Sequence, residues 1–205
     1  MLTAIDPGAA GACVRLVAGG RSPVVDRGAV WRTASDGRLI IDYTRARGGV
    51  YYRARVHHFW EIGSLLATHV ASDGDALIVE DAFLHGKSRN PASSFAVAKR
   101  GALIAAPICP IAAYGEIGWV HPSTWRACVL TASKGSNQRA AWKHAAMEQA
   151  PGLVENWQEL SGQLGSSDHL CEATGLAVSA YRAICGQRLS KGDVETIAQS
   201  IRSLR

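Results

Sequence analysis

The chain lacks several features that would place it in a specialised class of protein. No apolar run approaches the roughly 18 residues needed to span a bilayer, and the N-terminus has neither the basic nor the apolar segment of a secretory signal peptide. These absences predict a soluble, cytoplasmic protein. The five cysteines are odd in number, widely scattered and never arranged as CxxC, which argues against a zinc site and a disulfide framework. We expect buried thiols in a reducing compartment.

Domain linkers, internal repeats and low-complexity tracts are also missing. The 205 residues are within the usual range for one domain, and the 47% that are hydrophobic are enough to build a sizeable core. We therefore predict a single domain over residues 1–205.

The charge is modestly one-sided. A net charge of +5 and a pI near 9.1 only weakly favour an anionic partner, because many ordinary proteins are equally basic. Basic residues gather in three groups, HGKSRN (85–90), KR (99–100) and SKGSNQRAAWKH (133–144). Each group alone is best explained as solvated surface, whereas three groups near candidate catalytic segments favour a nucleic acid.

The order of apolar segments predicts an α/β layer architecture. Runs bounded by Pro and Gly predict strands at residues 2–6, 12–18, about 24–31 and 76–80, a further hairpin within 32–55, and one or two strands within 109–125. Helical spacing or composition predicts helices at 57–70, 92–105, from Thr124, and at 137–150, 166–185 and 190–204.

Acidic side chains end two of these strands and begin one helix. Asp6 precedes the turn PGAAG, and Glu80 ends the run ALIVE. Asp168 and Glu172 lie one helical turn apart and share a helix face, to which His169 also largely belongs. Clustered acids repel each other, and a divalent cation removes that cost. Mg²⁺ prefers oxygen ligands, and two such ions roughly 4 Å apart can activate a water and stabilise the leaving oxygen in phosphodiester cleavage.

Each acid also has an explanation without chemistry. Asp6 could simply end a strand and cap its turn, and Asp81 could mean that the strand ending at Glu80 is emerging into solvent. Asp168 stands in SSD, where a helix N-cap belongs, and Glu172 could be a first-turn acid favoured by the helix dipole. Singly these acids are weak indications, but four in this order favour a metal site.

Several blocks of the chain resemble the RuvC family of Holliday junction resolvases, within the RNase H-like nuclease superfamily. AIDPGAAGACV is similar to the family's first strand and turn, LIVEDAF to the strand with the second acid, and KRGALIAA to the helix segment that follows. HPSTWRACVL and SKGSNQRAAWKHA resemble a stretch of phage and organellar members, and DHLCEATGLAVSAY resembles the last catalytic helix. The blocks lie between residues 2 and 181, and the segment 32–55 has no counterpart, like an insertion.

The resemblance implies an RNase H-like mixed sheet flanked by helices, with metal ligation by Asp6, Glu80 and the acids of the last helix. The last two acids of the family are commonly three residues apart, whereas Asp168 and Glu172 are four apart. Some relatives carry a histidine three residues before the last acid, where His169 stands here. Both Asp168 and His169 therefore remain candidates for the third ligand, and all five residues are candidate catalytic and metal-binding residues.

The resemblance also implies contacts with DNA. Phe83, three residues after Glu80, matches an aromatic that inserts near the junction crossover, and stacking on a splayed base would suit it. Packing in the core is an equally good explanation of Phe83. Candidate contacts to phosphates, which would position DNA without reading its sequence, are Lys87, Arg89, Arg100, Lys134 and Arg139.

These implications describe a Mg²⁺ or Mn²⁺ dependent endonuclease with two ions per active site, acting on four-way DNA junctions in recombination and repair. Paired symmetric cuts need two active sites, so this substrate implies a homodimer with two-fold symmetry. Alternatives are an RNase H-like nuclease acting on RNA–DNA hybrids or other branched DNA, and a DNA-binding module without catalysis. The similarity to phage-type members implies a viral or prophage origin and action in the host cytoplasm.

Overall fold

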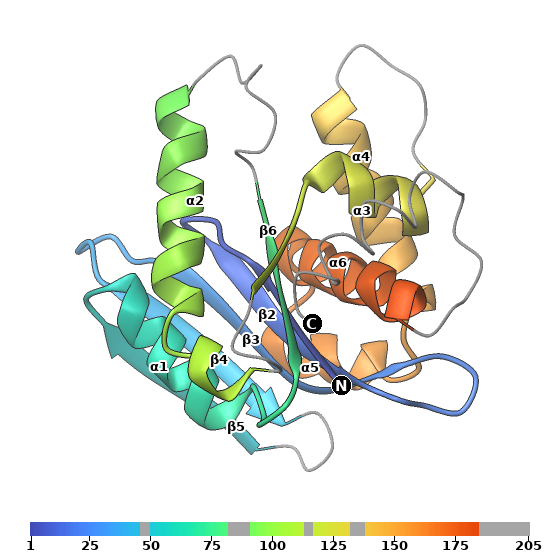
Figure 1. Ribbon diagram of the computed structural model, residues 1–205, viewed down its shortest axis with the longest axis horizontal. Helices are drawn as coiled ribbons and strands as arrows, with labels where there is room; N and C mark the ends of the chain where they lie inside the picture. The colour runs from blue at the N-terminus through green and yellow to red at the C-terminus, as the bar shows by residue number, and fades with distance from the viewer. Residues whose placement is uncertain (46–49, 82–90, 113–116, 132–137, 185–205) are drawn as a thin grey trace.

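A computed structural model describes residues 1–45, 50–81, 91–112, 117–131 and 138–184 (Figure 1). In this part of the chain no helix is both long enough and apolar enough to cross a membrane. The helix predicted at 190–204 lies outside the described residues.

A seven-stranded mixed sheet forms the centre of the molecule, in the order β5-β4-β3-β2-β1-β6-β7. Its antiparallel part is a meander of β1 (Leu2–Asp6), β2 (Gly11–Val17), β3 (Val24–Thr33), β4 (Leu39–Arg45) and β5 (Val50–Val56). Its parallel part adds β6 (Ala76–Glu80) beside β1 and β7 (Ile117–Val120) beside β6. The α/β architecture is confirmed, and so is the hairpin predicted within 32–55, which extends the sheet as β4 and β5.

Helices cover both faces of the sheet (Figure 1). One face carries α1 (Phe59–His69) and α2 (Pro91–Ala105), and the other carries α5 (Trp157–Leu164) and α6 (Asp168–Ile184). The helices α3 (Pro122–Val129) and α4 (Gln138–Gln149) pack against α6, and short 3-10 helices cover Cys109–Ile111 and Ala150–Gly152.

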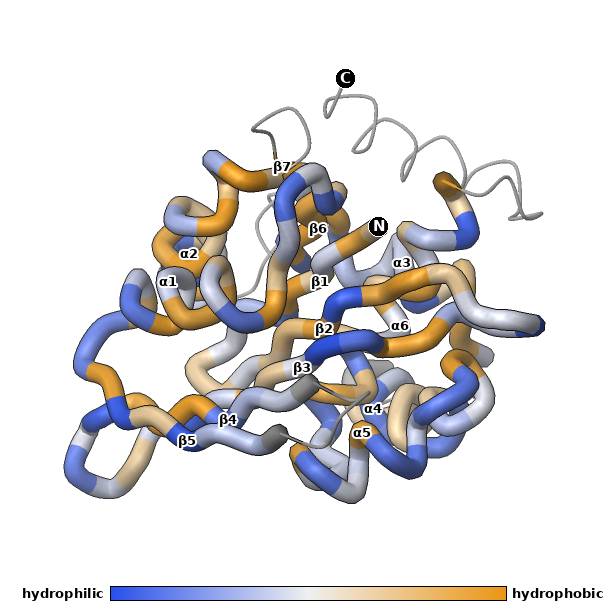
Figure 2. Tube along the Cα trace, turned by 90° about the horizontal axis from the view of Figure 1, so that it is seen from below, coloured by the Kyte–Doolittle hydropathy of each residue, from blue (hydrophilic) through white to orange (hydrophobic). Residues whose placement is uncertain are grey.

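Alternation along β1 divides the core into two hydrophobic clusters. Leu2 and Ala4 are buried against the α6 side, whereas Ile5 is buried against the α1 side. Successive strand residues point to opposite faces, so Asp6 belongs to the α6 side. In Figure 2 hydrophobic colour predominates along β1 and β6, while hydrophilic residues recur along the outer hairpin β4 and β5.

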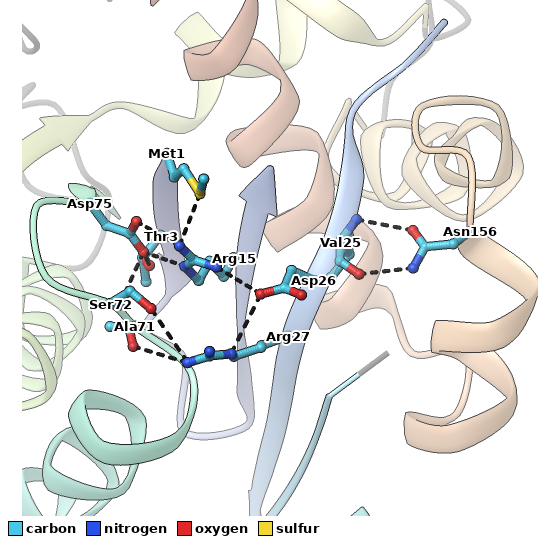
Figure 3. Close-up of polar contacts among 10 residues, drawn as sticks. All are labelled: Met1, Thr3, Arg15, Val25, Asp26, Arg27, Ala71, Ser72, Asp75 and Asn156. Carbon is cyan, nitrogen blue, oxygen red and sulfur yellow. Dashed lines mark hydrogen bonds and ion pairs between the residues drawn. The ribbon is translucent and has the colours of Figure 1, made fainter. Parts of the chain in front are cut away.

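A buried ionic network fixes β6 beside β1 at the end of these strands away from Asp6 (Figure 3). The guanidinium of Arg15 bonds Asp75 and Asp26, each at 2.7 Å, and Thr3 Oγ1 donates to Asp75 at 2.9 Å. Because Asp75 immediately precedes β6, these bonds help to set the register between β1 and β6. Figure 3 also shows Asn156, whose side chain bonds both backbone polar groups of Val25 in β3.

Two elements differ from the sequence prediction. Helix α5 was not predicted, because it has eight residues and shows apolar residues only at Trp157, Leu160 and Leu164, all of them buried. Gly28 of β3 lets α5 approach closely, since a Cβ there would lie 3.1 Å from both leucines. Within 109–125 the described residues form one strand, and a 3-10 helix stands where a second strand was considered.

The cysteines follow the prediction only in part. The four described cysteines are free thiols, with Cys13 and Cys171 buried and Cys109 and Cys128 half-buried. Burial raises the pKa of the Cys171 thiol to about 11. Cys185 lies outside the described residues.

Candidate functional site

Asp6 and Glu80 lie at the same end of two neighbouring parallel strands. The register pairs Ile5 with Val79, so the next residues along the strands, Asp6 and Glu80, stand side by side. Both are buried, with 7% and 9% of their surfaces exposed. Two buried carboxylates on adjacent strands are costly in an ordinary core, because burial and like charge both disfavour the ionised forms.

The turn after Asp6 is tight because glycine occupies two of its positions. A Cβ at Gly8 would lie 1.9 Å from the carbonyl oxygen of Ala10, and a Cβ at Gly11 would lie 2.5 Å from the ring of Trp31. Trp31 also donates from Nε1 to the carbonyl oxygen of Gly8 at 3.2 Å. The turn therefore folds β2 back directly beside Asp6, as the sequence predicted.

Helix α6 begins beside this turn and is capped by Ser167. The Ser167 hydroxyl accepts from the backbone N–H of Leu170 at 3.2 Å, and its carbonyl accepts from Cys171. The interpretation of Asp168 as the N-cap was therefore wrong by one residue. Asp168 is the first helical residue, and its carboxylate instead accepts a hydrogen bond from Lys143 of α4.

His169 turns toward Asp6, whereas Asp168 does not. His169 Nδ1 lies 2.8 Å from Asp6 Oδ2. Asp6, His169 and Glu172 each offer one ligand atom, and these three atoms lie within 4.8 Å of one another. Among the described residues the geometry thus places His169, rather than Asp168, next to the acid of β1.

Trp125 of α3 orients Glu80. The indole is fully buried, and its Nε1 donates to Glu80 Oε2 at 2.7 Å. Gly175 of α6 makes room for it, since a Cβ there would lie 2.6 Å from Trp125 Cζ3. Trp125 is therefore a core residue that also fixes one oxygen of Glu80.

Arg126 of α3 is a second contributor that the sequence did not single out. Its Nη2 lies 2.5 Å from Glu172 Oε1, and its guanidinium lies 5.2 Å from the centre of the Trp125 ring. The two neighbouring residues of α3 therefore hold two acids of the cluster, Glu80 and Glu172, in place. No periodic pattern marks these roles, because they depend on how α3 packs against α6.

The pKa values of the buried acids Glu80 and Glu172 are raised, chiefly by burial. Burial, with the charges of Asp6 and Glu172, raises the pKa of Glu80 to about 8 against the opposing charge of Arg126. Burial also raises the pKa of Glu172, although Arg126 works against it. The hydrogen bond with Asp6 raises the pKa of His169, with burial opposing.

Asp168 has the opposite shift. Burial would raise its pKa, but the hydrogen bond from Lys143 and the charge of His169 outweigh burial and lower it. Asp168 and Lys143 thus form a pair at the rim of the cluster. Asp168 also stays in contact with the group around Asp6, because its Oδ1 lies 3.7 Å from His169 Nε2, but it is not one of the three residues whose ligand atoms come together.

The donor set fits a divalent cation but does not select Mg²⁺. Carboxylate oxygens suit Mg²⁺ and Mn²⁺, while an imidazole nitrogen suits later first-row metals better. The group of Asp6, His169 and Glu172 mixes both kinds of donor. The raised pKa values of Glu80 and Glu172 mean that these acids hold protons more tightly than free carboxyl groups do. A cation there would take the place of these protons and supply the positive charge.

Most of the candidate DNA contacts cannot be placed. Phe83, Lys87, Arg89 and Lys134 lie outside the described residues, and Arg139 lies in α4 with its side chain outside them. Arg100 of α2 donates from Nε to the carbonyl oxygen of Pro7 at 3.4 Å, and its guanidinium lies 5.8 Å from the centre of the Phe59 ring. Arg100 therefore braces the turn after Asp6, and all six DNA contacts remain predictions.

No known protein family model matches the chain, and no curated protein matches it significantly.

Proposed function

We propose that the protein is a metal-dependent endonuclease of the RNase H-like type that cuts branched DNA, with four-way junctions as the main substrate. One observation carries the proposal: buried Asp6 and Glu80 stand at the ends of adjacent parallel strands, with Asp6 facing His169 and Glu172 from the first turns of α6. Such a cluster is expensive for a structural role and suited to holding cations.

The sheet order supports this proposal once the outer hairpin is set aside. Without β4 and β5 the sheet is a three-stranded antiparallel meander followed by the two parallel strands β6 and β7. We take this five-stranded unit as the RNase H-like core and the hairpin as the insertion, which accounts for the longer observed order.

The chain's own residues have distinct tasks in this proposal. Asp6, Glu80, Glu172 and His169 would hold the cations, which when bound activate water and neutralise the charge on the leaving oxygen. Trp125 fixes Glu80 through its indole N–H. Among the described residues Arg126 holds one oxygen of Glu172, which leaves the other oxygen for a ligand.

A cleavage assay tests the proposal. Labelled four-way junction, linear duplex and RNA–DNA hybrid are incubated with wild-type protein in Mg²⁺, in Mn²⁺ and in EDTA. The variant Asp6→Asn removes the central acid, and Asp73→Asn is the matched control, because Asp73 is exposed in the turn before β6. We expect metal-dependent junction cutting by wild type and by Asp73→Asn, and a loss of several hundred-fold or more in Asp6→Asn.

Other outcomes separate the alternatives. Preferential cutting of the hybrid would keep the same site and change the substrate. Tight junction binding without cutting in any metal would overturn the nuclease proposal in favour of a binding module. The two-fold homodimer follows from paired cutting, and sedimentation of the protein with and without junction tests it.

A further inference from the structure

Asp42 of β4 lies in the same row of the sheet as Asp6. The antiparallel register gives the row directly: Asp6, Ala12, Val30, Asp42 and Arg53. Residues directly opposite in antiparallel strands project from the same face. The outer hairpin and the candidate active site therefore share the face that α6 covers at β1 and β2.

Asp42 is a buried carboxylate that fixes three half-exposed donors. It is 5% exposed and accepts from Arg53 Nε at 2.6 Å and Nη2 at 3.2 Å, from Arg32 Nη1 at 3.1 Å and from Tyr51 Oη at 2.8 Å. The side chains of Arg32 and Arg53 remain 50% and 53% exposed. The carboxylate of Asp42 is therefore buried, whereas the side chains of Arg32 and Arg53 are exposed to solvent.

The surface charge of this face is positive. Arg55 follows Arg53 by two residues on the same strand, so it projects from the same face, and it is exposed. Asp36, whose carboxylate feels the charge of Arg55, is paired with Arg38 and adds no net charge. The three guanidinium charges of Arg32, Arg53 and Arg55 against the carboxylate of Asp42 therefore leave a local charge of +2. Fixed guanidinium forks match the geometry of phosphate oxygens better than free side chains do.

We propose that Arg32, Tyr51, Arg53 and Arg55, here called the hairpin face, bind the sugar–phosphate backbone of a DNA arm that leaves the active site. The inference rests on the proposed function, because it takes the occupant of the site to be DNA. Four strand spacings separate β1 from β5, or about 19 Å across the sheet. Phosphates repeat about every 3.4 Å along one strand, so the hairpin face meets the arm roughly five or six nucleotides from the cut.

Helix α5 limits the hairpin face on the side away from the active site. Thr44, in the next row of the sheet on this face, donates to Gln163 of α5. The exposed arginines lie on the other side of this row: Arg53 is in the row of Asp6, and Arg32 and Arg55 are in the row beyond it. An arm lying along these rows would contact backbone phosphates, which positions the substrate without sequence readout.

A second explanation of the arginines is protection of the sheet edge. Charged residues on an edge strand hinder pairing with another molecule, and β5 is an edge strand. This explanation does not cover Arg32, which lies on β3 two strands inside the edge. It also gives no reason for a buried carboxylate that fixes the guanidinium groups, whereas phosphate binding profits from that order.

The test measures binding of a labelled four-way junction by the full chain in EDTA, over a range of salt concentrations. The variants are Arg55→Gln and the double variant Arg32→Gln/Arg55→Gln, which leave the Arg53 and Tyr51 bonds to Asp42 intact. Arg21→Gln is the matched control, because Arg21 is exposed at the opposite end of the sheet, between β2 and β3. Thermal unfolding confirms that each variant is folded.

We expect the slope of log affinity against log salt to become shallower by about 0.9 in the single variant and about 1.8 in the double variant, with no change in Arg21→Gln. Wild-type slopes in both variants, while wild type still cuts DNA, would overturn the inference alone. Self-association of the variants with unchanged slopes would assign the arginines to edge protection, and a wild type that neither binds nor cuts DNA would overturn the proposed function as well.

Discussion

His169 Nδ1 lies 2.8 Å from Oδ2 of Asp6, although 163 positions separate the two residues in the sequence. The contact brings the start of α6 against the end of β1, and it places Glu172, one turn further along α6, within reach of the same point. A cation at this point would have two carboxylates and one imidazole as nearest donors.

Metal binding should depend on His169 rather than on Asp168. We expect Mn²⁺ to raise the unfolding temperature of wild type more than Mg²⁺ does, because the donor set contains an imidazole. His169→Asp makes the set all-oxygen, which suits both ions, and should narrow the difference between them. Asp168→Asn should leave the order unchanged, since Asp168 is bound by Lys143. Calorimetric unfolding with each metal and with EDTA measures these shifts in unfolding temperature. Loss of metal binding in Asp168→Asn alone would contradict His169 as the third ligand.

The stability of the metal-free protein should fall as the pH rises. The pKa of Glu80 is raised from 4.5 to about 8, chiefly by burial, so the folded state holds this proton more tightly than the unfolded chain. Its contribution is therefore complete below about pH 4.5 and is lost as the pH rises through about 8. His169 and Glu172 also have raised pKa values and act in the same direction.

Glu80→Gln isolates the share of Glu80 in this pH dependence. The amide oxygen can still accept from Trp125 and carries no charge to bury. We expect the free energy of unfolding at pH 8 in EDTA to increase by about 1–3 kcal/mol and the pH slope to become flatter. Urea titrations from pH 5 to 9 measure this, with the exposed Glu148→Gln as control. An unchanged slope in Glu80→Gln would show that Glu80 titrates normally.

The fit of Trp125 against α6 should make two glycines respond in opposite ways. Gly175→Ala places a Cβ 2.6 Å from Trp125 Cζ3, and we expect it to destabilise the protein by about 1–3 kcal/mol and to slow cutting by displacing Glu80. Gly162→Ala in α5 meets nothing within 4 Å among the described residues and should stabilise by up to about 1 kcal/mol. Equal effects of the two in thermal unfolding would contradict this packing.

The hairpin should be sensitive to acid through Asp42. Burial opposes ionisation, but hydrogen bonds from Arg53, Tyr51 and Arg32 outweigh it and lower the pKa of Asp42 below 3.8. The contribution of Asp42 is therefore present above about pH 3.8 and is lost as the pH falls through the folded value. Asp42→Asn should be less stable than wild type at pH 7, and the gap should narrow toward pH 3. Urea unfolding measures the difference in free energy of unfolding between wild type and Asp42→Asn. A difference that does not change with pH would contradict an ionised Asp42 in the folded protein.

The parts of the candidate site that could be predicted from the sequence lie at strand ends and on the face of one helix. Asp6 and Glu80 were recognisable because each ends a continuous apolar run, and parallel pairing of β1 and β6 brings such ends together. The helix around Glu172 was recognisable from its apolar periodicity. The hairpin of β4 and β5 was also predicted, although its position at the edge of the sheet was not.

The remaining features depend on packing between distant segments. Ser167 and Asp168 are adjacent and both suit an N-cap, so composition could not decide which one caps α6. Trp125 and Arg126 have their roles only because α3 crosses α6. Nothing in the sequence marks Asp42 within the segment 32–55. Its place in the same row as Asp6 becomes visible only from the register of the sheet.

Cuts on a four-way junction in which each of the four strands is labelled in turn test most directly whether the cluster around Asp6 cleaves DNA. We expect paired nicks at symmetric positions near the crossover, dependent on a divalent metal, present in Asp73→Asn and lost in Asp6→Asn. A junction that stays intact in every metal, or nicks that Asp6→Asn makes as well as wild type, would contradict the proposed nuclease function.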